Sequence, residues 1–324
     1  MWQPPYWRQN YGFSTKFETI RYFFPTFAPL LTPKIVYIMK MDGRRTSTNV
    51  EDRRGKGAAV AAGGIGLGGI IIYLIVSLMG GDANAVMEQM QQNTGSATTT
   101  EYVATEQEKA FELFASQILA STEDVWTAVF KQYGATYRAP KMVIFKGSVQ
   151  SGCGNASSDT GPFYCSADEK LYLDLDFFNE MQRSMGIKGD FACAYVIAHE
   201  VGHHVQNLLG TLGEAHQQMA RMDKTEANKV SVRIELQADY YAGVWGHHEQ
   251  KMFGSLEDGD LEEAINAAQK IGDDYLQRQA GYRQVQSDLF THGTSQQRMR
   301  WLKKGLQTGD LSQGDTFSPA YSSL

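Results

Sequence analysis

The residues of this chain that are best suited to chemistry lie in one short segment, His199-Glu200-Val201-Gly202-His203. If the segment is helical, its two histidines project from one face, because residues four apart differ by only about 40° around the axis. Two imidazoles on one face can bind the same tetrahedral Zn²⁺. Glu200 lies about 100° further round the helix, beside such a metal. This position predicts that Glu200 takes a proton from water and does not bind the metal.

A zinc peptidase needs a third protein ligand and keeps a fourth position open. The metzincin pattern would place Gly at position 206 and His at position 209, but the chain has Gln206 and Leu209, so this subclass is excluded. Glu235 and Asp239 are again four residues apart, in a stretch rich in Ala, Tyr and Val. We predict that Glu235 is the third ligand and that Asp239 accepts the ring N–H of a liganding histidine.

Two alternatives stay open for these acidic residues. Glu235 and Asp239 could form an exposed pair on a solvated helix, and His247 and His248 are then competing metal ligands. His204 projects from the far side of the first helix, where we expect it to be solvated.

The elements that position these side chains are mainly helices. Helical patterns begin at Thr105, where a capping box with Glu108 starts an amphipathic helix, and continue over residues 122–133, 190–210 and 228–243. Strand-forming residues occupy positions 141–149, 163–165 and 170–175, the last a candidate edge for pairing with a substrate backbone. The chain is therefore expected to be α+β, predominantly helical, with a small β element.

A segment without any charged residue, Ala58 to Met79, is long enough to cross a bilayer. Arg and Lys crowd its N-terminal flank, so we expect the N-terminus in the cytoplasm and the C-terminal domain outside it. Cleavage after Ala85 is the alternative to an uncleaved anchor. The expected organisation is a cytoplasmic segment (1–57), a transmembrane helix (58–80), a flexible linker (81–104), the catalytic domain (105–318) and a tail (319–324). Residues 1–40 differ in composition from the rest, which favours a translation start at Met39 or Met41.

Cys153 and Cys165 lie twelve positions apart in a Gly-rich stretch, a spacing that suits a local disulfide. A disulfide implies an oxidising compartment, which agrees with the expected topology. Two free thiols in a cytosolic protein are the alternative.

Composition limits the partners. The chain has a formal net charge of −6, and downstream of residue 60 it carries no basic run interleaved with aromatics, so nucleic acid is not expected as a partner. The expected partners are a protein or peptide substrate and the lipid bilayer, and no oligomeric state is specified. A non-catalytic zinc-binding scaffold and a metal-free membrane-tethered interaction protein are the competing functions.

Several segments together resemble the bacterial family of neutral zinc metallopeptidases. They are Ser151-Gly152-Cys153-Gly154, Gly161-Pro162-Phe163-Tyr164-Cys165, His199 to Gln206, Glu235 to Gly246 and Thr291-His292-Gly293-Thr294-Ser295. The resemblance runs from about Met41 to Phe317. It implies a zincin-like domain in the gluzincin arrangement at the bacterial inner membrane, with one Zn²⁺ held by His199, His203 and Glu235, and with Glu200 as the general base of peptide hydrolysis.

The sequence lacks an obvious motif for stabilising the oxyanion of that reaction. His292, with the turn-forming Gly293 after it, is the candidate donor. Its alternative role is that of a residue at the entry to a helix beginning near Ser295.

Overall fold

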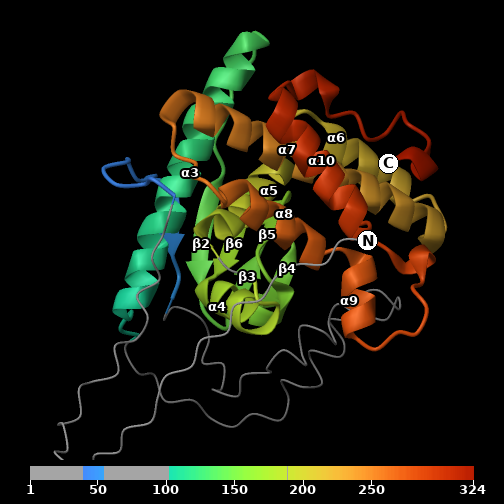
Figure 1. Ribbon diagram of the computed structural model, residues 1–324, viewed down its shortest axis with the longest axis horizontal. Helices are drawn as coiled ribbons and strands as arrows, with labels where there is room; N and C mark the ends of the chain where they lie inside the picture. The colour runs from blue at the N-terminus through green and yellow to red at the C-terminus, as the bar shows by residue number, and fades with distance from the viewer. Residues whose placement is uncertain (1–38, 55–101, 188) are drawn as a thin grey trace, which may run out of the picture. The chain divides into compact units, whose positions relative to one another are not determined.

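Helices and a small amount of sheet make up residues 39–54, 102–187 and 189–324, which the computed structural model describes (Figure 1). This agrees with the expected α+β class. The expected membrane span (58–80), the expected linker (81–104) except its last three residues, and nearly all of residues 1–40 fall outside these ranges. In the described part of the chain, no helix combines the length and the apolar character that a bilayer crossing requires.

The larger sheet has the strand order β1-β2-β6-β5, with β1 (Val50–Asp52), β2 (Lys141–Phe145) and β6 (Lys170–Asp174) parallel and β5 (Phe163–Cys165) antiparallel. Strand β2 is buried on both faces, as its uninterrupted apolar run requires. Met142 and Ile144 join the main core on one face. Val143 and Phe145 pack on the other face near the hairpin of β3 (Ser148–Ser151) and β4 (Gly154–Ser157).

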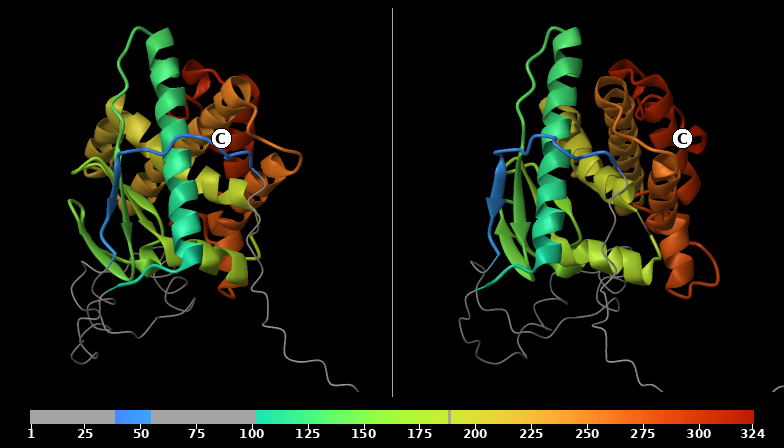
Figure 2. Two further views of the ribbon diagram at one scale, coloured as in Figure 1. Left: turned by 90° about the vertical axis from the view of Figure 1, so that its left-hand side faces the viewer. Right: turned by 60° about the vertical axis from the view of Figure 1, so that its left-hand side comes forward.

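Eight helices are described, and most of them surround one central helix. In chain order they are α3 (Glu106–Gln132), α4 (Leu175–Ser184), α5 (Asp190–Leu208), α6 (Thr211–Met219), α7 (Lys224–Phe253), α8 (Asp260–Lys270), α9 (Asp273–Gln279) and α10 (Ser295–Thr308). Helix α5 packs against α3, α6, α7 and α8, and α10 packs along α7 on the side away from the sheet (Figure 2). The short 3-10 turns are Ser158–Thr160, Ser287–Leu289, Leu311–Gln313 and Tyr321–Ser323.

Some expected boundaries are wrong for local reasons. The capping box of Thr105 and Glu108 does begin α3, but this helix runs on without the expected break near residue 122. Thr122 is buried there, and its hydroxyl donates to the Leu119 carbonyl one turn earlier. It therefore lies within the helix and does not cap the start of a new one. The expected strand 141–149 is divided in two at Gly147, whose φ of 81° breaks extended backbone.

Residues 39–54 pack into the same folded domain as the residues after 105, so the expected domain start at residue 105 is too late. Strand β1 pairs in parallel with β2, and Met39 and Met41 are buried in the main core. Arg44 contacts Glu249 on α7, with Nη1 lying 2.8 Å from Oε1. Figure 2 shows this segment running beside α3. Residues 39–54 are therefore not a segment separate from the folded domain.

The expected tail at 319–324 is also part of the folded domain. Leu324 is buried in the main core, and Tyr321 packs against it. The Arg300 side chain donates to the carbonyl of Ser323. The described residues 39–54 and 102–324 (save 188) thus lie within one compact unit.

Candidate metal centre

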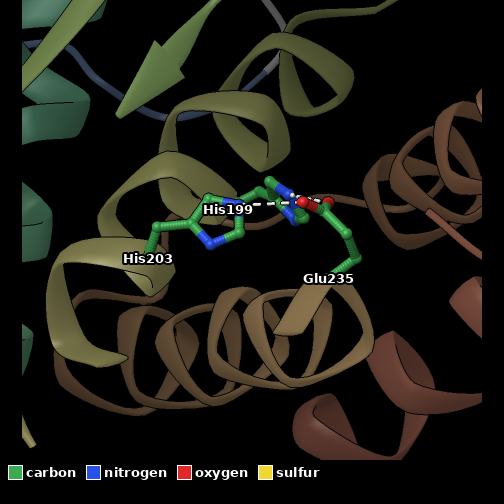
Figure 3. Close-up of side chains that lie close together, drawn as sticks. All are labelled: His199, His203 and Glu235. Carbon is green, nitrogen blue, oxygen red and sulfur yellow. Dashed lines mark hydrogen bonds and ion pairs between the residues drawn. The ribbon is translucent and has the colours of Figure 1, made fainter. Parts of the chain in front are cut away.

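His199 and His203 project from one face of α5 toward α7, as their spacing requires (Figure 3). Between them, Gly202 lets the two helices approach closely. A Cβ atom at position 202 would lie 2.9 Å from the carbonyl oxygen of Ala238, which is closer than side chains normally come. The glycine therefore sets the helix separation that a ligand on α7 needs in order to reach the two imidazoles.

Glu235 on α7 supplies that ligand. Its Oε2 lies 3.1 Å from Nε2 of His199, and its Oε1 lies 3.5 Å from Nε2 of His203 (Figure 3). One ligand atom from each of the three residues falls within 4.8 Å of the others. The structure thus brings the three expected ligands together, and the alternative of an exposed acidic pair is wrong, since Glu235 is largely and Asp239 fully buried.

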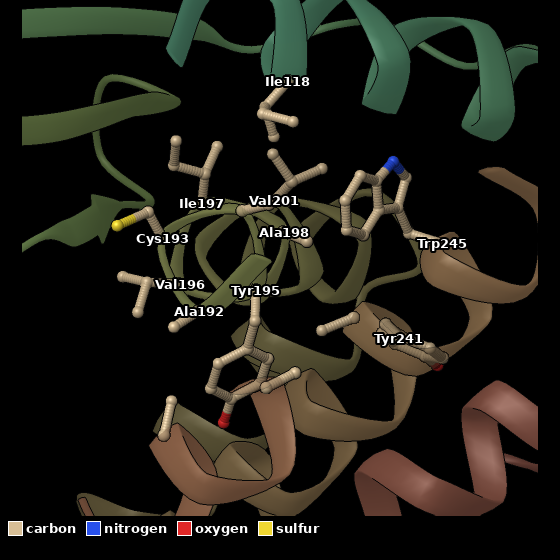
Figure 4. Close-up of a cluster of buried hydrophobic side chains, with 14 of the residues drawn as sticks. Ile118, Ala192, Cys193, Tyr195, Val196, Ile197, Ala198, Val201, Tyr241 and Trp245 are labelled. Atoms are coloured by element: carbon tan, nitrogen blue, oxygen red, sulfur yellow. The ribbon is translucent and has the colours of Figure 1, made fainter. Parts of the chain in front are cut away.

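Helix α5 is a firm support for the two imidazoles because it is buried on nearly every side. Ile197 and Val201 pack toward α3, where Ile118 lies, and Tyr195 points the opposite way (Figure 4). A helix that is apolar almost all round is typical of the centre of a domain. Side chains on such a helix are held by packing rather than by solvent.

Each metal-facing imidazole has its other nitrogen fixed by an acceptor. Nδ1 of His199 lies 2.8 Å from Oδ1 of Asp239, and Nδ1 of His203 lies 2.9 Å from Oε1 of Gln206. With a proton on each Nδ1, the lone pair of each Nε2 is free to bind a metal ion held between the two imidazoles and Glu235. This is the tautomer that a metal-binding histidine requires.

Asp239 is itself held by a buried arginine. Arg298 on α10 donates from Nε to Oδ2 at 2.8 Å and from Nη2 to Oδ1 at 3.0 Å, and the hydroxyl of Tyr195 donates to Oδ1 at 2.6 Å. Burial alone would raise the pKa of Asp239, but the charges of Arg298 and His199 outweigh it and lower the pKa to about 2. Asp239 therefore stays ionised and acts as a fixed acceptor.

Glu200 lines the same cavity as the three ligands, on the side of strand β5. Burial raises its pKa to about 7, although the nearby His199 and the backbone N–H of Tyr164 act in the opposite direction. A carboxyl group with a pKa near neutrality can both accept and return a proton. Its placement next to the ligands, and outside the group of three, matches the expected role of a base.

His292 also lines the cavity, at the end of a loop that Asp273 organises. Oδ2 of Asp273 accepts the backbone N–H groups of Thr291, His292 and Gly293 at 2.7 to 2.9 Å, and Oδ1 lies 3.2 Å from Nδ1 of His292. Burial lowers the pKa of His292, but the charges of Glu235 and Asp273 outweigh burial and raise it above the ordinary value. The side chain is held as a potential donor facing the ligands, and helix α10 begins three residues later.

His216, an exposed residue of α6, also lines the cavity but is outside the three-ligand group. The other histidines lie elsewhere. His247 and His248 bond to the carbonyls of Leu306 and Gly309, so neither competes for the metal. His204 is buried, not solvated as expected, and contacts the Tyr164 hydroxyl.

Sequence reasoning missed Arg298, Tyr195, Gln206 and Asp273. Of these, Gln206 had a local signal, because it follows His203 by three residues on one helix face. Arg298 and Asp273 lie far along the chain from the residues they hold.

The donor set fits zinc. Two imidazole Nε2 atoms and one carboxylate are a ligand set found in catalytic zinc sites, and a cavity of about 530 Å³ beside them leaves room for a fourth ligand and a substrate. The histidine Nδ1 acceptors supply the outer support that such sites need.

Comparison with known proteins agrees with this chemistry. A family model described as "Putative neutral zinc metallopeptidase" matches residues 39–317. The uncharacterized protein YpfJ of Escherichia coli (strain K12) is 47% identical over 292 residues, covering 86% of this chain and 99% of its own length. The uncharacterized protein Mb2605 of Mycobacterium bovis is 45% identical over 203 residues, covering 60% of this chain and 67% of its own. No solved structure matches. By the extent of the family match, the chain belongs to the family of neutral zinc metallopeptidases.

Proposed function

We propose that this protein is a zinc-dependent peptidase of the gluzincin type, which hydrolyses peptide bonds with Glu200 as general base. The observation that carries the proposal is the convergence of His199, His203 and Glu235 in one cavity, with Glu200 beside them. When bound, zinc polarises the peptide carbonyl and lowers the pKa of water toward about 7. The zincin-like architecture and the single Zn²⁺ per chain are part of this proposal.

The protein's own groups carry the proton transfers. Glu200 would accept the proton of the attacking water and pass it to the amine that leaves, since it lines the cavity beside the three ligands. His292 donates to the oxyanion that develops on the carbonyl, while Asp273 fixes its ring. Both groups face the same cavity, so both can act on one bound peptide.

Strand β5 is the edge along which a substrate would lie. The expected edge, residues 170–175, is wrong, because β6 is paired on both sides. In contrast, among the described strands β5 pairs only with β6, and Phe163 and Tyr164 line the cavity. The disulfide of Cys153 and Cys165 ties this strand to the β3–β4 hairpin, which limits its movement.

We also propose that the domain works outside the cytoplasm, where its disulfide can form. Residues 39–54 are packed on the domain and so share its compartment. Attachment of the chain to the bacterial inner membrane is part of this proposal.

The test combines metal analysis with one matched pair of substitutions. The purified chain is expected to hold one zinc and to cleave an unfolded protein. Glu200→Gln should keep the zinc and lose about 10²- to 10⁴-fold in kcat. Glu214→Gln, on the exposed side of α6, should change neither property. A folded protein that binds no zinc would overturn the proposal, and zinc without hydrolysis would favour a non-catalytic scaffold.

A further inference from the structure

The cavity around the metal ligands has two apolar walls. One wall includes Phe177, Met185 and Ile271, which pack against the main core. The other includes Leu212, Met219 and Ile234, which belong to a separate hydrophobic cluster formed by α6 and α7. Val196 of α5 also lines the cavity. Helix α6, which carries Leu212 and Met219 of the second wall, begins just after α5 ends.

The carboxylates and the guanidinium that line the same cavity already have a proposed role or a bound partner. Among the described lining residues, the carboxylates are those of the metal ligand Glu235 and of Glu200. The guanidinium of Arg298 is bound to Asp239 on two atoms. The imidazole of His216 lies at the second wall, since α6 carries it between Leu212 and Met219. The three side chains named for the first wall are all apolar and offer a charged substrate side chain no partner.

These observations favour one class of substrate. An apolar side chain gains free energy in proportion to the apolar area that it removes from water. A charged side chain placed against the first wall would lose its hydration without finding a partner, and a basic one would find no free carboxylate at the second wall. The substrate residues on either side of the cleaved bond would thus decide which peptides bind.

We propose, building on the peptidase function, that this enzyme cleaves extended polypeptide between large apolar residues such as Leu, Ile, Phe and Met. Met219 and Phe177 determine this specificity, one on each wall. Segments of this kind are exposed when proteins unfold and are buried when they are folded, because folding removes such residues from water. The substrate class is accordingly the apolar stretches of unfolded proteins.

The first experiment measures binding without turnover. Zinc-loaded Glu200→Gln protein is titrated by calorimetry with two peptides of equal length, which carry Leu-Leu or Lys-Glu at the centre and are otherwise identical. The Leu-Leu peptide is expected to bind at least about tenfold more tightly. Equal binding, tighter binding of the charged peptide, or no binding of either peptide would overturn the inference.

The second experiment uses the active enzyme and a matched pair of variants. Met219→Glu should lower kcat/KM for a Leu-Leu peptide about tenfold or more and should shift cleavage of an unfolded protein toward sites with Lys, with zinc content unchanged. Met222→Glu, at an exposed position that does not line the cavity, should leave the cleavage pattern as it was. A pattern unaffected by Met219→Glu would contradict its assigned role. Absence of all cleavage by zinc-loaded wild type would instead count against the peptidase function, and the calorimetry would still decide the preference.

Discussion

Oδ1 of Asp239 lies 2.8 Å from Nδ1 of His199, so a residue of one helix sets the proton position of a metal-facing histidine on another. The carboxylate is fully buried and is clamped by Arg298 from α10. Side chains from α5, α7 and α10 therefore fix the orientation of one imidazole ring. This arrangement explains why an acidic residue four positions after a ligand is buried in an apolar helix.

Asp239→Asn is expected to weaken zinc binding about 10- to 100-fold, because the amide can offer an N–H to Nδ1 and so favour the wrong tautomer. It also leaves Arg298 without its counter-ion, so the free energy of unfolding should fall by about 3 to 5 kcal/mol. Competition with a chelator and thermal unfolding measure the two effects. Unchanged zinc affinity in a folded Asp239→Asn protein would show that the contact does not orient His199.

Gly202→Ala is expected to separate α5 from α7, since its Cβ would meet the Ala238 carbonyl. Overpacking of this kind lowers the free energy of unfolding by about 1 to 3 kcal/mol. It should also weaken zinc binding, because Glu235 lies one turn before Ala238. Gly213→Ala is the control: it lies in α6 with open space around it, so the added methyl should stabilise the helix by up to about 1 kcal/mol. Equal changes in the free energy of unfolding of the two variants, measured by denaturant unfolding, would contradict this explanation.

Local spacing predicted which side chains the structure brings together at the candidate site, and long-range packing limited the rest. His199, His203, Glu235 and Asp239 form two pairs four residues apart, and helix geometry alone places each pair on one face. The clamp by Arg298 could not be predicted, because 59 residues separate it from Asp239.

Strand β1 could not be predicted either. It has only three residues and becomes a strand through pairing with β2, some ninety positions away. The charge bias before residue 57 predicted a cytoplasmic flank. The ion pairs that these arginines form could not be predicted from that bias, for example those of Arg45 with Glu123 and Asp124.

Residues 39–54 are predicted to share a compartment with the domain in the full chain. The backbone N–H of Ser47 donates to the carbonyl of Ser116 on α3 at 3.1 Å, and the Ser116 hydroxyl donates to the carbonyl of Ser47, so the two positions are close enough for an engineered disulfide to test the contact. The Ser47→Cys, Ser116→Cys double variant is produced in cells and its disulfides are mapped by mass spectrometry. Ser47→Cys alone is the control. Formation of the Cys153–Cys165 bond without the engineered one would place residues 39–54 elsewhere.

Glu263 predicts a pH dependence of stability. Burial, with the charge of Asp190, raises its pKa to about 7 in the folded protein. Because the folded pKa exceeds the unfolded value, near 4.5, the contribution of Glu263 to stability is complete below about pH 4.5 and is lost as the pH rises through 7. Glu263→Gln removes this loss and can still accept the backbone N–H of Phe191. Its melting temperature should therefore rise relative to wild type between pH 5 and pH 8, and a constant difference would contradict the assignment.

His292→Gln tests the proposed oxyanion donor. If the imidazole contacts the carbonyl oxygen only as charge develops there, its loss should lower kcat about 10²- to 10³-fold and leave KM nearly unchanged. Zinc content should be retained, because His292 lies outside the three-ligand group. Asp273→Asn should have a smaller effect on kcat, since its side-chain carbonyl oxygen can still accept backbone N–H groups of the loop. Loss of zinc, or a rise in KM at constant kcat, would assign His292 to structure or ground-state binding. A selective loss of kcat requires that the ring act on the transition state.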